Sequence, residues 1–504
     1  MTSGWGDGYV TDIGYDGGYY REQSPGQLQL ACLLCGVDWD VPAEGAHYVE
    51  LGCGLGLGAL IVAAANPGWR VTALDFNPAH IASARAMARE AGLGNVTFLE
   101  ADLAHFAETP ACAALPDADI VTAHGVWSWV SEEVQAGIVR LLQAKLRPGG
   151  IMHLSYNALP GWQGMLAVQR TIREAGLRMA TRSDRQAQRG LEVLRDLANA
   201  EATALRADPR TSMWITESTV YSPAYLAHEF MNGHWKPCWQ SDVAAALSGA
   251  RLDFVGAATL IENFPELAMT AQQRAVWDRF EDPIMQELVK DLCLARTLRH
   301  DIYVRGGRRL GVAQRDAALR ELHVALLMPP DKVALEVQIG SIKAELSREF
   351  YGPVIERLAR GPARVGDLLH LPGSVAQREN PAELTGLLVG MRQVVVAVRP
   401  EAGCEDAVRR LNTVFARRFA QLENLNRGFT LASAMVGAGV NCSMLDLYAA
   451  GRLLEGETEV DTAGWTQALV GHLSAEDQGK IEAAFNEVRN SSLPRLRALG
   501  CAPA

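Results

Sequence analysis

The pattern that most constrains this chain is a regular alternation of apolar and helical segments between residues 46 and 156. Short apolar runs that end in glycine or a carboxylate alternate with stretches whose apolar residues recur at helical spacing. Repeated strand–helix alternation predicts a parallel sheet covered by helices on both faces. The expected strands are residues 46–51, 70–75, 95–99, 118–123 and 151–156, and the expected helices are residues 58–66, 78–92 and 131–146.

The middle of the chain changes character after residue 163. It is helical and rich in arginine up to about residue 206, whereas residues 251–257 and 301–305 again have the apolar character of strands. We expect these two strands to complete the sheet, so that residues 163–245 form a largely helical insertion. Gly306 and Gly307 indicate a hairpin-like turn after the second of them.

The last third of the chain predicts further domains. Residues 342–400 contain three helical stretches followed by a β-rich run at residues 393–398, an order that resembles a winged helix. The last hundred residues look mostly helical and include an amphipathic helix around residues 409–422. The domain division expected from this organisation is residues 1–162, 163–312, 313–404 and 405–504.

Composition narrows the class of protein. Of 504 residues 48% are hydrophobic and 21% charged, which is typical of globular chains. The longest apolar run, residues 59–65, is too short to span a bilayer, and no secretory leader is evident. Nine cysteines without a disulfide rhythm fit a reducing compartment. We therefore expect a cytoplasmic protein that does not insert into membranes.

The net charge of −11 lies mainly in the first third of the chain. Residues 1–165 carry 7 Lys and Arg against 17 Asp and Glu. A field of this sign repels nucleic-acid backbones and attracts cations, although a contribution to solubility alone explains it equally well.

A glycine-rich loop between the first strand and the first helix predicts a nucleoside site. Gly52, Gly54, Gly56 and Gly58 alternate there. Glycine allows a sharp turn and a close approach of a ligand to backbone N–H groups. Asp75, at the end of the second strand, can accept hydrogen bonds from both ribose hydroxyls.

The spacing alone leaves the cofactor open, because Gly54, Gly56 and Ala59 also satisfy the dinucleotide fingerprint. Glu50 before the loop, glycine at every second position and Asp102 after the third strand favour S-adenosylmethionine over a nicotinamide cofactor or an unliganded turn. The expected donor-binding residues are Glu50, Gly52, Cys53, Gly54, Gly56, Asp75, Phe76, Ala101, Asp102, Leu103 and His124.

Three further motifs carry a family resemblance. Residues 124–130 read HGVWSWV, residues 155–162 read SYNALPGW and residues 225–230 read YLAHEF. They resemble signatures of bacterial class I methyltransferases that carry a methyltransferase regulatory domain, a family that includes rickettsial protein-lysine methyltransferases acting on outer-membrane protein. The resemblance covers most of residues 15–310 and, more loosely, the tail. Residues 19–25 keep only the aromatic and the proline of the corresponding family segment, which bears on the substrate.

The resemblance implies a Rossmann-like seven-stranded, mostly parallel sheet and the in-line transfer of a methyl group to lysine side chains of a protein, with a surface protein as one candidate. Two alternatives stay open: a methyltransferase for a sugar or another small molecule, and a silent donor-binding module. A homodimer is a further open alternative.

Methyl transfer needs positioning and electrostatics, and aromatic rings attract ammonium groups. Core packing of the tryptophans and a structural role for His124 remain alternatives. The expected catalytic residues are His124, Trp127, Tyr20, Tyr156 and Asn157, and the expected substrate-binding residues are Tyr19, Trp127, Trp129 and Trp162.

Metal and nucleic acid are not expected as partners. His228, His234 and Cys238 lack an evident fourth ligand. The third helix expected in the winged-helix-like segment, residues 381–392, is mostly apolar and lacks the side chains that read bases.

Overall fold

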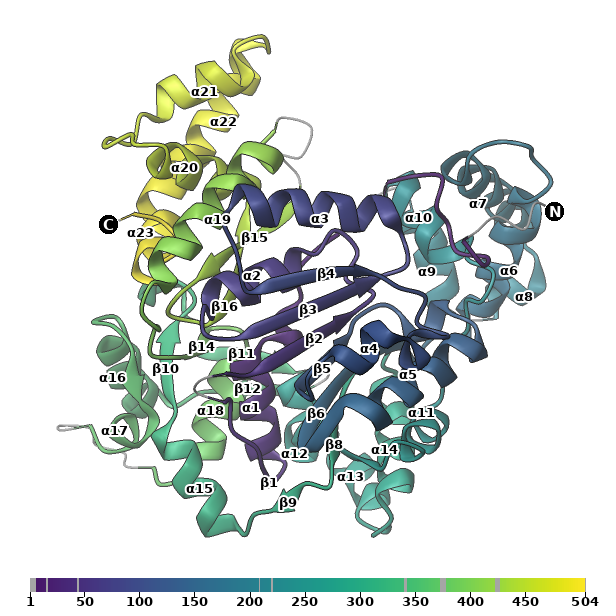
Figure 1. Cartoon of the computed structure of the whole chain (residues 1–504), viewed down its shortest axis with the longest axis horizontal. Coiled ribbons are helices and arrows are strands. Elements are labelled where there is room, and N and C mark those ends of the chain that lie inside the picture. The colour runs from purple at the N-terminus through teal and green to yellow at the C-terminus, as the bar shows by residue number, and fades with distance from the viewer. Residues whose placement is uncertain are drawn as a thin grey trace.

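The computed structural model describes residues 6–14, 17–42, 45–207, 209–218, 221–339, 342–371, 378–421 and 427–503. A seven-stranded sheet forms its centre, with the strand order β4-β3-β2-β5-β6-β8-β7 (Figure 1). All neighbours pair in parallel except β8, which is antiparallel to β6 and to β7. The strands are β2 (His47–Leu51), β3 (Arg70–Asp75), β4 (Val96–Glu100), β5 (Ala118–Ala123), β6 (Leu146–Asn157), β7 (Leu252–Ala257) and β8 (Leu298–Arg305). The expected fold is therefore confirmed, including the two strands that complete the sheet after the insertion.

Helices cover both faces of this sheet. One hydrophobic cluster joins the sheet to α1, α2 and α3, and a second joins it to α5 and α11. The local sequence explains where these helices begin: Asn77 caps α3 ahead of Pro78, and Ser131 caps α5 ahead of two glutamates. The bounds are α1 (Pro25–Leu34), α2 (Leu57–Ala65), α3 (Pro78–Glu90), α4 (Pro110–Ala114), α5 (Glu132–Lys145) and α11 (Gln240–Ser248).

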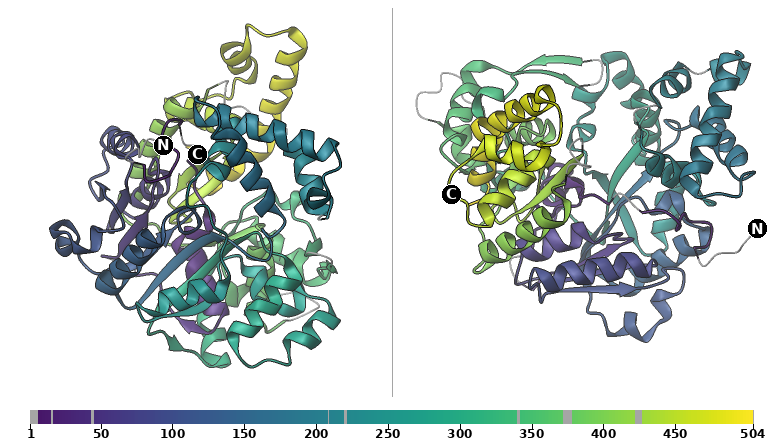
Figure 2. Two further views of the ribbon diagram at one scale, coloured as in Figure 1. Left: turned by 90° about the vertical axis from the view of Figure 1, so that its right-hand side faces the viewer. Right: turned by 90° about the horizontal axis from the view of Figure 1, so that it is seen from above.

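The segment between β6 and α11 is helical, as expected. Its helices pack around a small core of their own, which also contains Val10 from the N-terminal segment. They lie on the side of the molecule opposite the C-terminal helices (Figures 1 and 2). The bounds are α6 (Met165–Gly176), α7 (Ser183–Asn199), α8 (Thr203–Arg206), α9 (Pro209–Glu217) and α10 (Pro223–Phe230); α12 (Pro265–Ala268), α13 (Ala271–Trp277) and α14 (Pro283–Leu294) follow between β7 and β8.

The turn at Gly306 and Gly307 does not make a hairpin. The strand after it, β9 (Arg308–Arg309), pairs with β1 (Val37–Asp38) and not with β8. The hairpin interpretation is therefore wrong: the chain leaves the sheet at this turn and crosses to the segment that follows α1.

Beyond this turn, the three helices expected in residues 342–400 are present and pack with a three-stranded antiparallel sheet of order β13-β10-β14. Most residues of α18, the third of them, are buried, and a Cβ on Gly386 would lie 2.4 Å from the ring of Phe264. Its apolar side chains are thus used in packing. The bounds are α15 (Val312–Glu321), β10 (His323–Leu326), β11 (Glu336–Ile339), β12 (Ile342–Glu345), α16 (Arg348–Leu358), β13 (Ala363–Arg364), α17 (Val365–Leu369), α18 (Pro381–Gly390) and β14 (Val394–Ala397).

The last hundred residues are mostly helical but contain a β-hairpin that the sequence interpretation missed. Strands β15 and β16 pair in antiparallel register, with Gly428 opposite Ser443 and Ser433 opposite Ala438. The bounds are α19 (Cys404–Phe419), β15 (Gly428–Ser433), β16 (Ala438–Ser443), α20 (Met444–Leu454), α21 (Thr462–Val470), α22 (Ala475–Glu487) and α23 (Leu493–Ala498).

This C-terminal region packs directly on the helices of the central sheet. Its side chains belong to the same hydrophobic cluster as α2 and α3. Asn66, at the end of α2, donates to the carbonyl oxygen of Gly437 at 2.9 Å, and Arg410 of α19 donates to the carbonyl oxygen of Ala91 at 2.9 Å. The tail therefore forms an additional layer over this face of the sheet.

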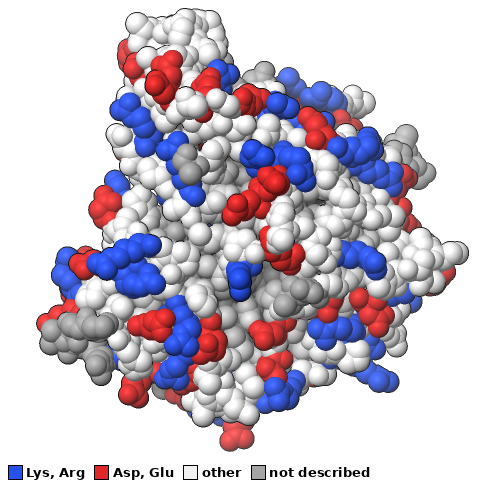
Figure 3. All heavy atoms as spheres, turned by 60° about the vertical axis from the view of Figure 1, so that its left-hand side comes forward, with Lys and Arg blue, Asp and Glu red and all other residues white. Residues whose placement is uncertain are grey.

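Charges of both signs alternate on the face formed by this tail (Figure 3). The arginines of the expected amphipathic helix are paired: Arg417 with Glu455 at 2.7 Å, and Arg418 with Glu90 at 2.6 Å. None of the helices in the described part of the chain combines the length and the apolar character needed to cross a membrane.

Candidate active site

The glycine loop connects β2 to α2 in a conformation that only glycine adopts readily. Gly52, Gly54 and Gly56 have φ angles of +67°, +53° and +75°. A Cβ on Gly52 would lie 2.4 Å from Val126, and one on Gly56 would lie 2.5 Å from the ring of Phe98. The loop therefore needs glycine both for its backbone angles and for its close packing against β4 and the segment after β5.

Asp75 fixes this loop from the end of β3. Its Oδ2 accepts a hydrogen bond from Gly54 N at 2.8 Å, and its Oδ1 accepts one from Asn77 N at 2.9 Å. His80 Nδ1 lies 3.4 Å from Oδ1. Since an ionised carboxylate offers about four acceptor positions, two bonds to the backbone leave capacity for ligand hydroxyls.

A cavity of about 490 Å³ opens at the carboxyl ends of β2, β3, β4 and β5. Ligands of parallel α/β sheets bind at this edge, and the volume lies in the range of small-molecule sites. The expected donor or substrate residues that line it are Gly52, Gly54, Asp75, Phe76, Ala101, Asp102, Leu103, His124 and Trp129. These residues fit S-adenosylmethionine, because they combine an open glycine loop with carboxylates at two strand ends. We call this the donor cavity.

Three expected donor residues lie outside the lining of the donor cavity: Glu50, Cys53 and Gly56. The Glu50 carboxylate lies under the first turn of α2, where a Cβ on Gly58 would meet Oε1 at 2.7 Å. Its Oε2 is buried without a hydrogen-bond partner among the described residues. Burial raises the pKa of Glu50 to about 7, against lowering contributions from Ala59 N and Gln23.

This buried carboxyl group makes stability depend on pH. The folded protein holds the Glu50 proton up to about pH 7, whereas the unfolded chain releases it near its ordinary pKa of 4.5. The free energy of unfolding therefore decreases as the pH rises from 4.5 to about 7. Glu50→Gln removes this loss. We expect urea unfolding without donor to show the variant gaining about 2–3 kcal/mol on wild type between pH 5 and pH 8. Parallel pH profiles for the two proteins would contradict the assignment.

The N-terminal segment lies across the donor cavity, which the sequence interpretation did not anticipate. Tyr9 lines the cavity, and its ring packs edge-on against Phe76 with centroids 5.5 Å apart. The segment is held by α10 and the turn after it, where Val10 N donates to Asn232 Oδ1 at 3.0 Å and Gly233 N to Gly8 O at 2.7 Å. The helical insertion therefore positions a wall of the donor cavity.

His124 and Tyr20 meet at the end of β5. Their rings stack with centroids 3.4 Å apart. His124 Nδ1 lies 3.0 Å from the Ser155 hydroxyl, which also accepts a bond from Gly125 N. Burial first, and then the neighbouring His300 and His153, lower the pKa of His124 well below its usual value. The imidazole that faces the donor cavity is therefore neutral at pH 7.

Asn157, at the end of β6, contacts a carboxylate that the sequence interpretation gave no role. Its Nδ2 donates to Glu229 Oε1 at 2.9 Å, and its backbone N donates to Ser128 Oγ at 2.8 Å. Glu229 belongs to the YLAHEF motif on α10. The signal available in the sequence was a carboxylate inside this motif, near the end of a helix.

Five of the expected aromatic residues lie outside the donor-cavity lining: Trp127, Tyr156, Trp162, Tyr19 and Tyr20. Trp127 is only 2% exposed and packs in the cluster beneath α5, so the structure favours core packing for it. Tyr156 is buried and donates its hydroxyl proton to Asp301 Oδ2 at 2.6 Å. Trp162 packs against Phe230 and Trp235 in the helical insertion. The Trp127 and Tyr156 side chains are thus engaged in the interior.

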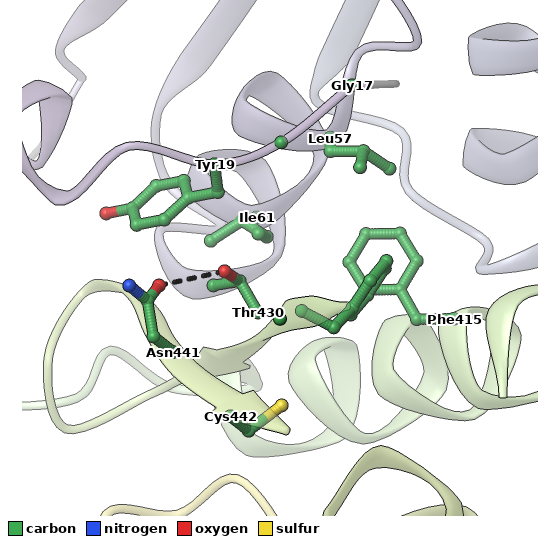
Figure 4. A pocket seen from close by; sticks show the side chains of 11 residues that line it. Gly17, Tyr19, Leu57, Ile61, Phe415, Thr430, Asn441 and Cys442 are labelled. Carbon is green, nitrogen blue, oxygen red and sulfur yellow. Dashed lines mark hydrogen bonds between the residues drawn. The ribbon is translucent and has the colours of Figure 1, made fainter. Parts of the chain in front are cut away.

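Tyr19 contacts the C-terminal layer, whereas its neighbour Tyr20 stacks on His124. Tyr19 lines a separate hollow of about 230 Å³ between α2 and the β15–β16 hairpin, beside Ile61 and the hydrogen-bonded pair Thr430–Asn441 (Figure 4). Its role there is contact with the C-terminal layer, since a Cβ on Gly439 would lie 2.8 Å from its ring.

The described residues contain no group of three or more His, Cys, Asp or Glu side chains arranged to hold a metal ion. Of the candidates considered from the sequence, His228 bonds through Nε2 to Gly14 O at 3.0 Å, and Cys238 Sγ to the carbonyl oxygen of Lys236 at 3.3 Å.

Two stretches of the chain match known families. Residues 49–152 match the family described as "Methyltransferase domain", and residues 222–305 match "Predicted methyltransferase regulatory domain". The first contains the glycine loop and Asp75, and the second runs from α10 to the end of β8 and contains Glu229.

Individual proteins are similar over different lengths. An uncharacterized protein of Synechocystis sp. (strain ATCC 27184 / PCC 6803 / Kazusa) is 30% identical over 364 residues, which cover 72% of this chain and 71% of that protein. A trans-aconitate 2-methyltransferase of Paracidovorax citrulli is 34% identical over 113 residues, 22% of this chain and 39% of that enzyme. The fold of PKMT2 from Rickettsia typhi, solved in complex with AdoHcy, matches with a TM-score of 0.70 at 15% identity, covering 97% of this chain and 99% of that one.

Proposed function

The chain belongs to the class I S-adenosylmethionine-dependent methyltransferases that carry a methyltransferase regulatory domain, and from this premise we propose that it methylates lysine side chains of a protein. The observation that carries the choice of acceptor is the charge of the donor cavity. Five carboxylates are among the described residues that line it, and no Lys or Arg is: Asp7, Asp75, Glu100, Asp102 and Glu133. A negative, partly enclosed wall attracts cations and disfavours anions.

The proposed reaction requires the residues around the donor cavity to bind and orient the reactants. When bound, S-adenosylmethionine supplies an activated methyl group, which passes to nitrogen as the carbon–sulfur bond breaks with its electron pair on sulfur. A lysine has a reference pKa of about 10.4, so it must lose a proton to expose the attacking lone pair. The Asp75-held loop and the N-terminal segment at Tyr9 then orient the donor and exclude water.

The runner-up is a small-molecule methyltransferase, which the trans-aconitate enzymes represent among the relatives. An anionic acceptor requires Arg or Lys side chains to bind its carboxylates. Arg does so as a planar guanidinium and Lys as a compact charge. The lining of the donor cavity offers neither among the described residues. The match to PKMT2 along nearly the whole chain also supports the protein substrate over this alternative.

Incubation of the full chain with methyl-labelled S-adenosylmethionine and host lysate tests the proposal. We expect label on lysine, with a KM for the protein acceptor that rises about three- to tenfold between roughly 0.05 M and 0.5 M salt, because screening weakens capture. The turnover number should change little with salt and should increase from pH 7 to pH 9. Label that enters only sugars or metabolites, with no mass gain on lysine, would establish the runner-up instead.

A further inference from the structure

A carboxylate beside the donor cavity has one oxygen engaged by the protein and one left open. Glu229 lies near the end of α10, where Asn157 Nδ2 donates to its Oε1 at 2.9 Å and Trp235 Nε1 donates to the same oxygen at 3.0 Å. The segment after α10 is itself anchored on the end of β6, since Cys238 N donates to Asn157 O at 2.8 Å. Glu229 is therefore held in a fixed position.

The second oxygen of Glu229 has no such bond. Among the described residues, no hydrogen bond or ion pair is formed by Oε2. Burial raises the pKa of the Glu229 carboxyl above its usual value, and the bonds from Trp235 and Asn157 lower it in part. A link between α10 and β6 needs only the one oxygen that accepts both bonds. The charge and the second oxygen are thus not explained by structure alone.

Two aromatic side chains lie near this carboxylate: Trp235 donates a hydrogen bond to it, and Tyr225 precedes it by one turn of α10. The charge of Glu229 contributes, after desolvation, to the raised pKa of the Tyr225 hydroxyl. Tyr9, which lines the donor cavity, is raised in pKa first by burial and then by Asp75 and Glu229. A carboxylate among aromatic faces is the combination that binds alkylammonium groups.

We propose that Glu229, with Trp235, Tyr225 and Tyr20, forms the site that binds the ammonium group of the acceptor. This inference rests on the proposed function, in which the acceptor is a lysine side chain. Tyr20 connects this site to the transfer position, because it stacks on His124 at the wall of the donor cavity. Burial first, and then Glu229, Tyr221 and Tyr20, raise the pKa of the Tyr225 hydroxyl, which agrees with this arrangement.

Glu229→Gln separates the charge from the structural contacts. A glutamine keeps a carbonyl oxygen that accepts the bonds from Asn157 and Trp235, so the variant should fold with an unchanged melting temperature. Binding of butylammonium, a lysine side-chain mimic, is measured by ligand-detected NMR on the full chain saturated with S-adenosylhomocysteine. We expect affinity to fall about tenfold to a hundredfold in Glu229→Gln, since a charge-assisted bond is lost. Glu192→Gln, an exposed glutamate on α7, is the matched control and should bind as wild type does.

Equal affinity of wild type and Glu229→Gln for butylammonium, or no binding by wild type, overturns this inference. Steady-state kinetics give the second readout: KM for the lysine-bearing protein should rise by the same factor, Glu229→Asp should recover part of it, and donor affinity should stay constant. Lysine methylation with an unchanged KM in Glu229→Gln overturns the inference and leaves the proposed function intact. Butylammonium binding that depends on Glu229, in an enzyme that labels no lysine, supports the ammonium site and overturns the lysine assignment.

Discussion

Replacing Asp75 by alanine is expected to weaken the binding of S-adenosylmethionine by at least a hundredfold. The carboxylate holds Gly54 N and Asn77 N, so its removal releases the glycine loop as well as the bonds offered to the ribose. A hydrogen bond to a charged group contributes about 1.5–3 kcal/mol, and two such losses amount to about 3–6 kcal/mol. Calorimetric titration of the donor into the full chain measures the change directly.

Two further variants show whether the effect belongs to the donor cavity. Asp75→Asn keeps one acceptor oxygen and should lose less affinity than Asp75→Ala. Asp119 is a matched control, because it also accepts a backbone bond, from His47 N at 2.7 Å at the start of β2. Asp119→Asn should leave donor affinity unchanged. Wild-type affinity in a folded Asp75→Ala protein would remove Asp75 from the donor site.

The central fold could be predicted because its signals are local. Each strand of the sheet is a short apolar run, and each turn is marked by glycine, proline or a capping side chain such as Asn77 or Ser131. Even β7 and β8 were recognisable after the long insertion, because their apolar character does not depend on which strand they join. What the sequence does not contain is the partner of a short strand: β9 follows a good turn signal yet pairs with β1.

The packing of the tail on the sheet was harder to predict, although a signal existed. Every residue of α2 is buried, so this helix must be covered on the side away from the sheet as well. The sequence interpretation expects a helix over residues 58–66 but does not use the continuous apolar run at residues 59–65 to predict a second covering layer. The β15–β16 hairpin was missed because its strands contain glycine, serine and asparagine, which weaken a strand pattern.

Most of the expected donor residues lie together along the donor cavity, whereas most of the expected acceptor residues do not, for a geometric reason. Donor residues follow strand ends, which converge at one edge of the sheet whatever the rest of the chain does. Acceptor side chains depend on the direction that each one takes: Tyr19 and Tyr20 are neighbours, yet one meets the C-terminal hairpin and the other His124. Glu229 reaches Asn157 only through the packing of α10, which periodicity does not reveal.

The end of β6 that presents Asn157 is supported by a buried ion network on the neighbouring strand. Arg299 of β8 is 0% exposed and bonds to three carboxylates, with 2.9 Å contacts to Asp301, Asp291 and Glu287. Asp301 also accepts the bond from the Tyr156 hydroxyl. The guanidinium is therefore the common partner of groups on β8 and α14.

Arg299→Met is expected to lower the free energy of unfolding by about 3–5 kcal/mol, because removing one member of a buried ion pair leaves its partners uncompensated. The remaining cations, Arg296 and Lys290, would still pair with Glu262, Glu287 and Asp291, whereas Asp301 would lose its cation. Urea unfolding followed by far-UV circular dichroism measures the loss.

Arg308→Met is the control. Arg308 pairs with Asp38 on the surface at 73% side-chain exposure, so its replacement should lower the free energy of unfolding by less than about 1 kcal/mol. Adding Asp301→Asn to Arg299→Met should recover part of the stability, whereas a loss below about 1 kcal/mol in Arg299→Met would show that the network is not needed to hold β8 against β6.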